Sequence, residues 1–154
     1  MAAVVLLGGC TSLMVTPTPE RISDEIRTQG AGRVVHRLWE NGDYRQVLDG
    51  ISAGDSKWIA LAPALAAGTD AASSEGLSLA LARALPKNPA AVLSVLQPDR
   101  GAVSAPRVCG LPFIEGDIID VADYRRSAIA AVTKVDGDSL KDAKAACLVG
   151  LNRS

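Results

Sequence analysis

Apolar residues recur at helical spacing along most of the chain after residue 19. The clearest stretch follows Ser74, where they fall at intervals of three and four and form one stripe: Leu77, Ala80, Leu81, Ala84 and Leu85. Similar, shorter stretches are separated by glycine and proline, the residues that end helices. We predict helices over about residues 19–30, 31–41, 44–51, 56–67, 74–85, 89–96, 118–135 and 139–151.

Proline and aspartate mark several of the expected helix boundaries. Pro63 lies inside the 56–67 segment, where its ring and its missing N–H should break the helix. Asp43 and Asp55 precede helical segments and can cap them. The chain therefore predicts an all-α fold, either a small irregular bundle or a short HEAT-like α-solenoid of about six to eight short helices. The helix pair on either side of Asp70 faintly resembles one HEAT-like unit.

The helical pattern stops between residues 97 and 116, where prolines and glycines are frequent. We expect a loop of about 20 residues there, and loops of this length are often functional. A strand over residues 103–113 is the weaker alternative.

This loop contains the only phenylalanine of the chain, close behind Cys109. We interpret it as a candidate partner contact made by Leu111, Phe113, Ile114 and Glu115, because a constrained apolar loop loses little entropy on binding. The alternative is structural: Phe113 and Ile114 would fill the core beside Cys109.

Composition supports a folded, helical chain without indicating a partner class. Hydrophobic residues make up 48% and charged residues 21%, which excludes a disordered chain, and aromatic residues only 3%. Alanine and leucine, which dominate, are strong helix formers. The net charge is −1 and the lysines and arginines are scattered, so no basic face for nucleic acid is visible.

The N-terminus has the pattern of an export signal. Residues 1–7 are all apolar but too few to span a bilayer. The sequence Leu7-Gly8-Gly9-Cys10 resembles the lipobox of bacterial lipoproteins, in which the cysteine is lipidated and becomes the mature N-terminus. The missing Lys or Arg before the apolar run departs from that pattern. A buried N-terminal element with an incidental cysteine is the alternative.

The lipobox resemblance implies a division of the chain and a location. Residues 1–9 would be the signal segment, residues 10–19 a proline-interrupted tether, and residues 20–154 a single helical domain. The resemblance further implies a membrane-anchored protein on the periplasmic side. Thr11, which follows the cysteine and is not aspartate, favours the outer membrane in a Gram-negative organism.

The chain has three cysteines, so lipidation of Cys10 would leave Cys109 and Cys147. In an exported chain two such cysteines usually pair. The bridge would close a loop of about 39 residues and contribute roughly 4 kcal/mol in the chain-entropy model. Two buried thiols in a cytosolic protein are the alternative. With one histidine and two isolated cysteines, no zinc site or other cofactor is expected.

A second resemblance covers much of the chain without adding an activity. The run 54–96, followed by Cys109-Gly110-Leu111-Pro112-Phe113-Ile114-Glu115, is similar to a group of uncharacterised proteobacterial exported proteins. No functional residue is transferred from it.

Few residues have the pattern of a catalytic site. His36, the only histidine, is expected on a helix surface. An acidic cluster could hold a cation or act as acid and base, although helix capping explains it more simply: Glu115, Asp117, Asp120 and Asp123. Asp136 and Asp138 flank a glycine but lack the rest of a calcium loop.

Three functions remain after these exclusions. The favoured one is a non-enzymatic, lipid-anchored helical module that acts through protein contacts, with no nucleic-acid partner. The second is a periplasmic inhibitor or immunity protein that blocks a toxin or hydrolase. The third, and weakest, is an enzyme that uses the acidic cluster of residues 115–123.

Overall fold

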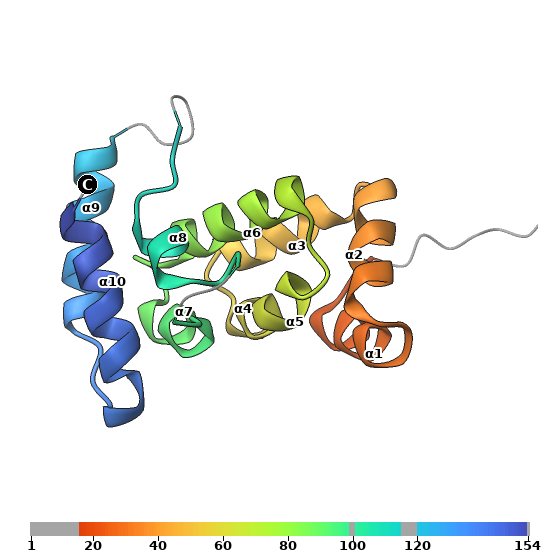
Figure 1. Ribbon diagram of the computed structural model, residues 1–154, viewed down its shortest axis with the longest axis horizontal. Coiled ribbons are helices and arrows are strands. Elements are labelled where there is room, and N and C mark those ends of the chain that lie inside the picture. Colours follow the sequence, from red (N-terminus) through yellow and green to blue (C-terminus); the bar gives the residue numbers. More distant parts are fainter. Residues whose placement is uncertain (1–15, 99–100, 115–119, 154) are drawn as a thin grey trace, which may run out of the picture.

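Short helices follow one another along the long axis of the molecule, with α1 and α2 at one end and α9 and α10 at the other (Figure 1). The computed structural model describes residues 16–98, 101–114 and 120–153. These residues form ten α-helices and one 3-10 helix: α1 Pro19–Gln29, α2 Ala31–Glu40, α3 Tyr44–Ser52, α4 Ser56–Ala60, α5 Ala62–Ala66, α6 Ala71–Ala84, α7 Pro89–Val95, α8 Ala105–Cys109, α9 Val121–Thr133, η1 Asp138–Leu140 and α10 Lys141–Arg153.

The predicted all-α fold is confirmed, and the irregular bundle describes it best. Within the described ranges the only strand-like pairing is an isolated bridge between Gln97 and Ser104. Helix α6 packs chiefly against α3, rather than against the helices just before it. The packing of α6 on the preceding helix segment, which a HEAT-like unit would require, is therefore not the principal contact of α6.

Two predicted boundaries follow the expected chemistry. Pro63 lies in the first turn of α5, so the predicted segment 56–67 is divided into α4 and α5. Asp55 caps α4, because its carboxylate accepts from the backbone N–H groups of Lys57 at 2.8 Å and Trp58 at 3.2 Å. Asp43 precedes α3 but makes no capping hydrogen bond with its side chain, so that predicted cap is wrong.

Helix α6 begins earlier than predicted. Its first residue is Ala71 rather than Ser74, because Asp70 and Ser73 form a capping box. The Asp70 carboxylate accepts from the Ser73 N–H at 2.9 Å, and the Ser73 hydroxyl accepts from the Asp70 N–H at 2.9 Å. These hydrogen bonds satisfy two N–H groups that no helical carbonyl can reach.

The expected loop over 97–116 is also partly wrong, because it contains α8. Pro106 lies in the first turn of this helix, where a backbone N–H has no helical partner and its absence costs nothing. The same helix replaces the strand considered over 103–113. A helix this short shows no clear apolar periodicity, so the prolines and glycines around it indicate a loop instead.

The core is one continuous cluster of buried apolar side chains that runs from Ile22 in α1 to Leu151 in α10. All five residues of the predicted α6 stripe are buried in it. Small residues bring helices close together, as at Gly68. A Cβ at this position would lie 2.4 Å from the backbone carbonyl of Ala31, so no larger residue fits between the end of α5 and the start of α2.

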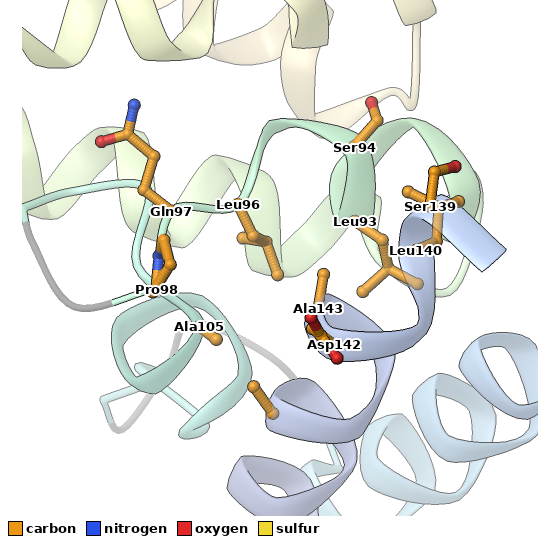
Figure 2. A pocket seen from close by; sticks show the side chains of 11 residues that line it. Leu93, Ser94, Leu96, Gln97, Pro98, Ala105, Ser139, Leu140, Asp142 and Ala143 are labelled. Atoms are coloured by element: carbon orange, nitrogen blue, oxygen red, sulfur yellow. The ribbon is translucent and has the colours of Figure 1, made fainter.

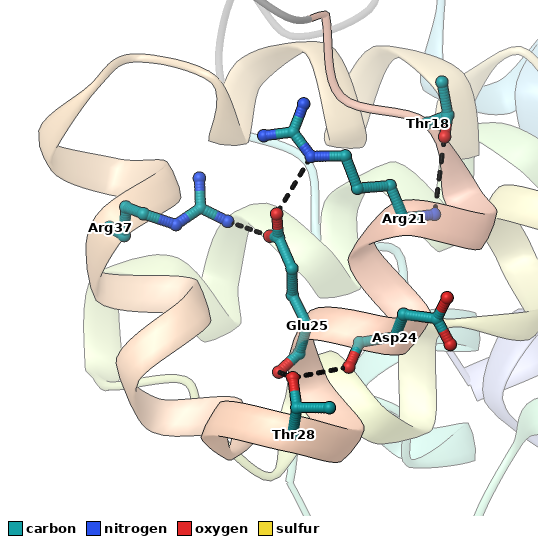
Figure 3. A network of polar contacts seen from close by, with 6 residues as sticks. All are labelled: Thr18, Arg21, Asp24, Glu25, Thr28 and Arg37. Atoms are coloured by element: carbon teal, nitrogen blue, oxygen red, sulfur yellow. Dashed lines mark hydrogen bonds and ion pairs between the residues drawn. The ribbon is translucent and has the colours of Figure 1, made fainter.

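Polar contacts fasten α1 to α2 (Figure 3). The Glu25 carboxylate accepts from Arg21 in its own helix at 2.9 Å, and its second oxygen pairs with Arg37 of α2. Thr18 caps α1 by accepting from the Arg21 N–H at 3.4 Å, and Pro17 is buried. Residues 17–19, which the sequence placed in a tether, therefore belong to the folded part.

Candidate interaction surface

A disulfide joins Cys109, the last residue of α8, to Cys147 in the middle of α10. The Cα atoms lie 5.1 Å apart and both cysteines are fully buried. The predicted pairing is confirmed, and the alternative of two free thiols is wrong. Residues 110–114 thus leave α8 from a point that is covalently tied to α10.

The packing of α8 on α10 is close beside the disulfide. Gly150, nearly one turn after Cys147, faces the backbone of Cys109. A Cβ on residue 150 would lie 3.1 Å from the Cys109 carbonyl carbon and oxygen, tighter than ordinary van der Waals contact. Glycine at this position lets the two helices meet at the distance that the disulfide requires.

The segment after α8 divides the predicted contact residues into inward and outward side chains. Leu111 adopts a positive φ of 55°, which is uncommon for a branched residue, and its side chain packs against the core. Phe113 meets Tyr124 of α9 edge to face, with ring centroids 4.5 Å apart. Ile114 is 75% exposed. Glu115 lies outside the described residues.

Phe113 is half-buried against Tyr124 and is not one of the core side chains, and Ile114 is exposed, so neither residue fills the core beside Cys109. Ile114 is the most exposed large apolar side chain in the described part of the chain; the next is Trp39, at 51%. A single exposed isoleucine is unremarkable on a protein surface. Because Ile114 lies beside a hollow, it is a candidate for contact with a partner.

The hollow lies between α6 and the segment that follows α8, and we call it the α6–loop groove. Its volume is about 500 Å³ and its lining comes from three parts of the chain: Ala72, Glu75, Gly76, Ser78, Leu79, Arg107, Pro112 and Ile114. Glu75 and Arg107 supply one charge of each sign. The groove thus combines an apolar edge with two opposite charges, so it offers both apolar and polar contacts to a partner.

Polar groups at the groove are held by other parts of the fold. The Ser78 hydroxyl donates to the carbonyl of Ala102 at 2.8 Å or of Ser74 at 2.9 Å. Arg107 donates through Nη1 to the Ser74 hydroxyl at 3.4 Å. These contacts tie the beginning of α6 to α8 and its preceding turn, so the groove walls are braced against each other.

The sequence did not identify the α6 side of this groove. Leu79 was the available signal, because it is apolar but lies outside the predicted buried stripe. Arg107 and Pro112 had no comparable signal. Nothing in a linear pattern indicates that a turn thirty or so residues downstream returns to the first half of α6.

The described members of the predicted acidic cluster have structural roles. Asp120 caps α9 by accepting from the Asp123 N–H at 2.9 Å, and Asp123 pairs with Arg126 at 2.8 Å. Glu115 and Asp117 lie outside the described residues. No three His, Cys, Asp or Glu side chains in the described part are grouped so as to hold a metal ion.

The single histidine lies on the surface, as predicted. His36 is exposed on α2 and borders a small hollow of about 220 Å³ together with Trp39 and Asp70. The Ser73 hydroxyl and backbone N–H hold the pKa of Asp70 below its usual value, because both donate to its carboxylate. This carboxylate is therefore occupied as a helix cap.

Comparison with protein-family models, with curated proteins and with solved structures gives no match for this chain. Among the helices that the structure describes, none has the length and apolar content needed to cross a membrane.

Proposed function

We propose that this chain is a non-enzymatic helical module, anchored by a lipid on Cys10 at the periplasmic side of a membrane, that acts through protein contacts. The lipobox-like sequence ending at Cys10 supports the anchor and its location, with the outer membrane favoured. The observation that carries the contact is Ile114, 75% exposed at the edge of the α6–loop groove.

A contact at Ile114 is supported by the way in which the surrounding segment is held in place. The segment 110–114 is held at its start by the disulfide and near its end by the Phe113–Tyr124 ring contact. Tyr124 in turn donates its hydroxyl hydrogen to the carbonyl of Ala82 in α6 at 2.6 Å. A partner that covers Ile114 would meet a surface already ordered, so little conformational entropy would be lost on binding.

Site-specific photocrosslinking tests the contact. A photoreactive residue is placed at position 114 and, in a control, at position 39, which is also exposed and lies on α2 at the opposite end of the molecule (Figure 1). In native membranes we expect a discrete crosslinked species from position 114 and none from position 39. Equal patterns from both positions, or none from either, would overturn the proposed contact.

The crosslinked species also distinguishes two forms of the same proposal. A secreted toxin or hydrolase captured at position 114 would make the module an inhibitor or immunity protein. A resident membrane or periplasmic protein would make it part of an assembly.

The anchor is tested separately. Mass spectrometry of protein extracted from the membranes of its native host should find a lipidated Cys10 at the mature N-terminus, and Cys10→Ser should release the protein to the soluble fraction. An unmodified Cys10 with Met1 still attached would refute lipidation and leave the contact at Ile114 to be judged by crosslinking alone.

A further inference from the structure

A second hollow lies between α7 and the beginning of α10 (Figure 2). Its volume is about 460 Å³, within the range of roughly 300–1,000 Å³ in which proteins hold small molecules. The lining comes from α7 and the turn that follows it, from α8, and from η1 and α10: Leu93, Ser94, Leu96, Gln97, Pro98, Ala105, Ser139, Leu140, Asp142, Ala143 and Ala146.

The inner wall of this α7–α10 hollow is apolar. Leu93 comes from α7, Leu96 from the end of that helix and Leu140 from η1 (Figure 2). Alanines at 105, 143 and 146 leave the space between these leucines open, where larger side chains would fill it. Removing an apolar ligand from water against such a wall is favourable.

One charged residue, Asp142, lines the hollow. The neighbouring cations have other partners: Lys141 pairs with Asp138, and Lys144 donates to the carbonyls of Thr133 and Val135, both at 2.7 Å. Asp142 takes part in none of the ion pairs found among the described residues. The hydroxyls of Ser94 and Ser139 add acceptors at the rim.

We propose that the α7–α10 hollow binds a small organic amine, with its apolar body against Leu93, Leu96 and Leu140 and its ammonium group at Asp142. An ammonium matches this lining because it donates hydrogen bonds and carries the opposite charge. An anion would meet Asp142 without a lysine or arginine among the lining residues. The site is distinct from the α6–loop groove and needs neither a lipid anchor nor a protein partner.

Three probes with the same apolar chain test the charge preference. Hexylammonium, hexanol and heptanoate are titrated into the complete chain while the methyl NMR signals of Leu93, Leu96 and Leu140 are followed. We expect saturable shifts at these methyl groups, with hexylammonium bound at least about threefold more tightly than hexanol, the scale of an exposed ion pair, and heptanoate bound most weakly.

Two variants with matched controls locate the site. Asp142→Asn should remove the preference for the ammonium, whereas Asp136→Asn, at an exposed acid outside the lining, should preserve it. Ala146→Leu should block all three probes, whereas Ala145→Leu, its exposed neighbour on α10, should not. Both lining positions are exposed, so the fold should tolerate either change.

The remaining outcomes would overturn the proposal. Equal binding of the three probes, or an ammonium preference that survives Asp142→Asn, would refute the role of the carboxylate. Shifts spread over the whole surface, or no saturable shift at the three leucines at millimolar concentrations, would refute the site itself.

Discussion

The aromatic ring of Phe113 lies edge to face against the ring of Tyr124, with centroids 4.5 Å apart and planes at 74°. This contact connects the segment after α8 to α9, and the Tyr124 hydroxyl continues the connection to the Ala82 carbonyl in α6. Three parts of the chain that are distant in sequence are thereby fixed to one another. Phe113 thus lies against Tyr124, whereas its neighbour Ile114 is 75% exposed.

The disulfide should contribute a large share of the folding stability. Replacing both Cys109 and Cys147 with serine removes a cross-link between residues 38 apart in sequence. The expected loss is roughly 4 kcal/mol of unfolding free energy, because the unfolded chain regains the freedom of that loop. Urea unfolding measures it, with Cys10→Ser as the control, for which no change is expected. A double variant as stable as the parent would contradict the prediction.

Tyr44, which is buried, and Tyr124, which is partly buried, should make the fold sensitive to high pH. Burial raises the pKa of Tyr44 and of Tyr124, and each hydroxyl donates to a backbone carbonyl of α6. A raised pKa in the folded state means that the neutral form is favoured by folding. That stability is complete below the unfolded pKa of about 10 and is lost as pH rises through the higher, folded value.

Unfolding free energies measured from pH 8 to pH 12 should therefore fall above about pH 10. Tyr124→Phe should be less stable at pH 8 by about 0.5–1.5 kcal/mol, the net value of a hydrogen bond, and should show a shallower decline at high pH. A decline as steep as that of the parent would mean that Tyr124 does not take part.

Much of the fold could be predicted from the sequence because helix periodicity and proline placement are local. The α6 stripe, the break at Pro63 and the cap at Asp55 all depend on residues within a few positions of one another. The start of α6 was misplaced because Ser74 and Asp70 are both good caps, and only the reciprocal bonds with Ser73 decide between them.

The candidate groove was predictable on one side only. The sequence singled out the segment around Ile114, because its sole phenylalanine and its cysteine stand out among prolines and glycines. Which of its side chains point outward depends on Tyr124, and the opposite wall depends on how α6 packs. Both are long-range contacts that leave no periodic trace in the sequence.

The Glu25 carboxylate should contribute more to the unfolding free energy than the exposed carboxylate of Asp24, one position away. Glu25 is partly buried and holds two arginines from two helices, Arg21 and Arg37. We expect Glu25→Gln to lower the unfolding free energy by about 0.5–1 kcal/mol, with a smaller loss in high salt. Asp24→Asn, which removes only the exposed pair with Arg27, should have no measurable effect in the same urea titrations. Equal effects of the two variants would show that the bridge from α1 to α2 adds nothing to the unfolding free energy.

The glycines at positions 150 and 32 should respond to alanine in opposite directions. Both lie within α-helices, but a Cβ at Gly150 would lie 3.1 Å from the Cys109 backbone, whereas one at Gly32 would have no heavy atom within 4 Å. Gly150→Ala must push α8 away from α10 against the disulfide, so we expect a loss of about 1–3 kcal/mol. Gly32→Ala should instead gain about 0.5–1 kcal/mol, because alanine loses less backbone entropy in a helix. Thermal and urea unfolding of the two variants measure both effects.

Stabilisation by both substitutions would contradict this prediction and would mean that the α8–α10 contact can relax. The crosslinking efficiency at position 114, measured in the Gly150→Ala background, would then show whether that contact positions Ile114.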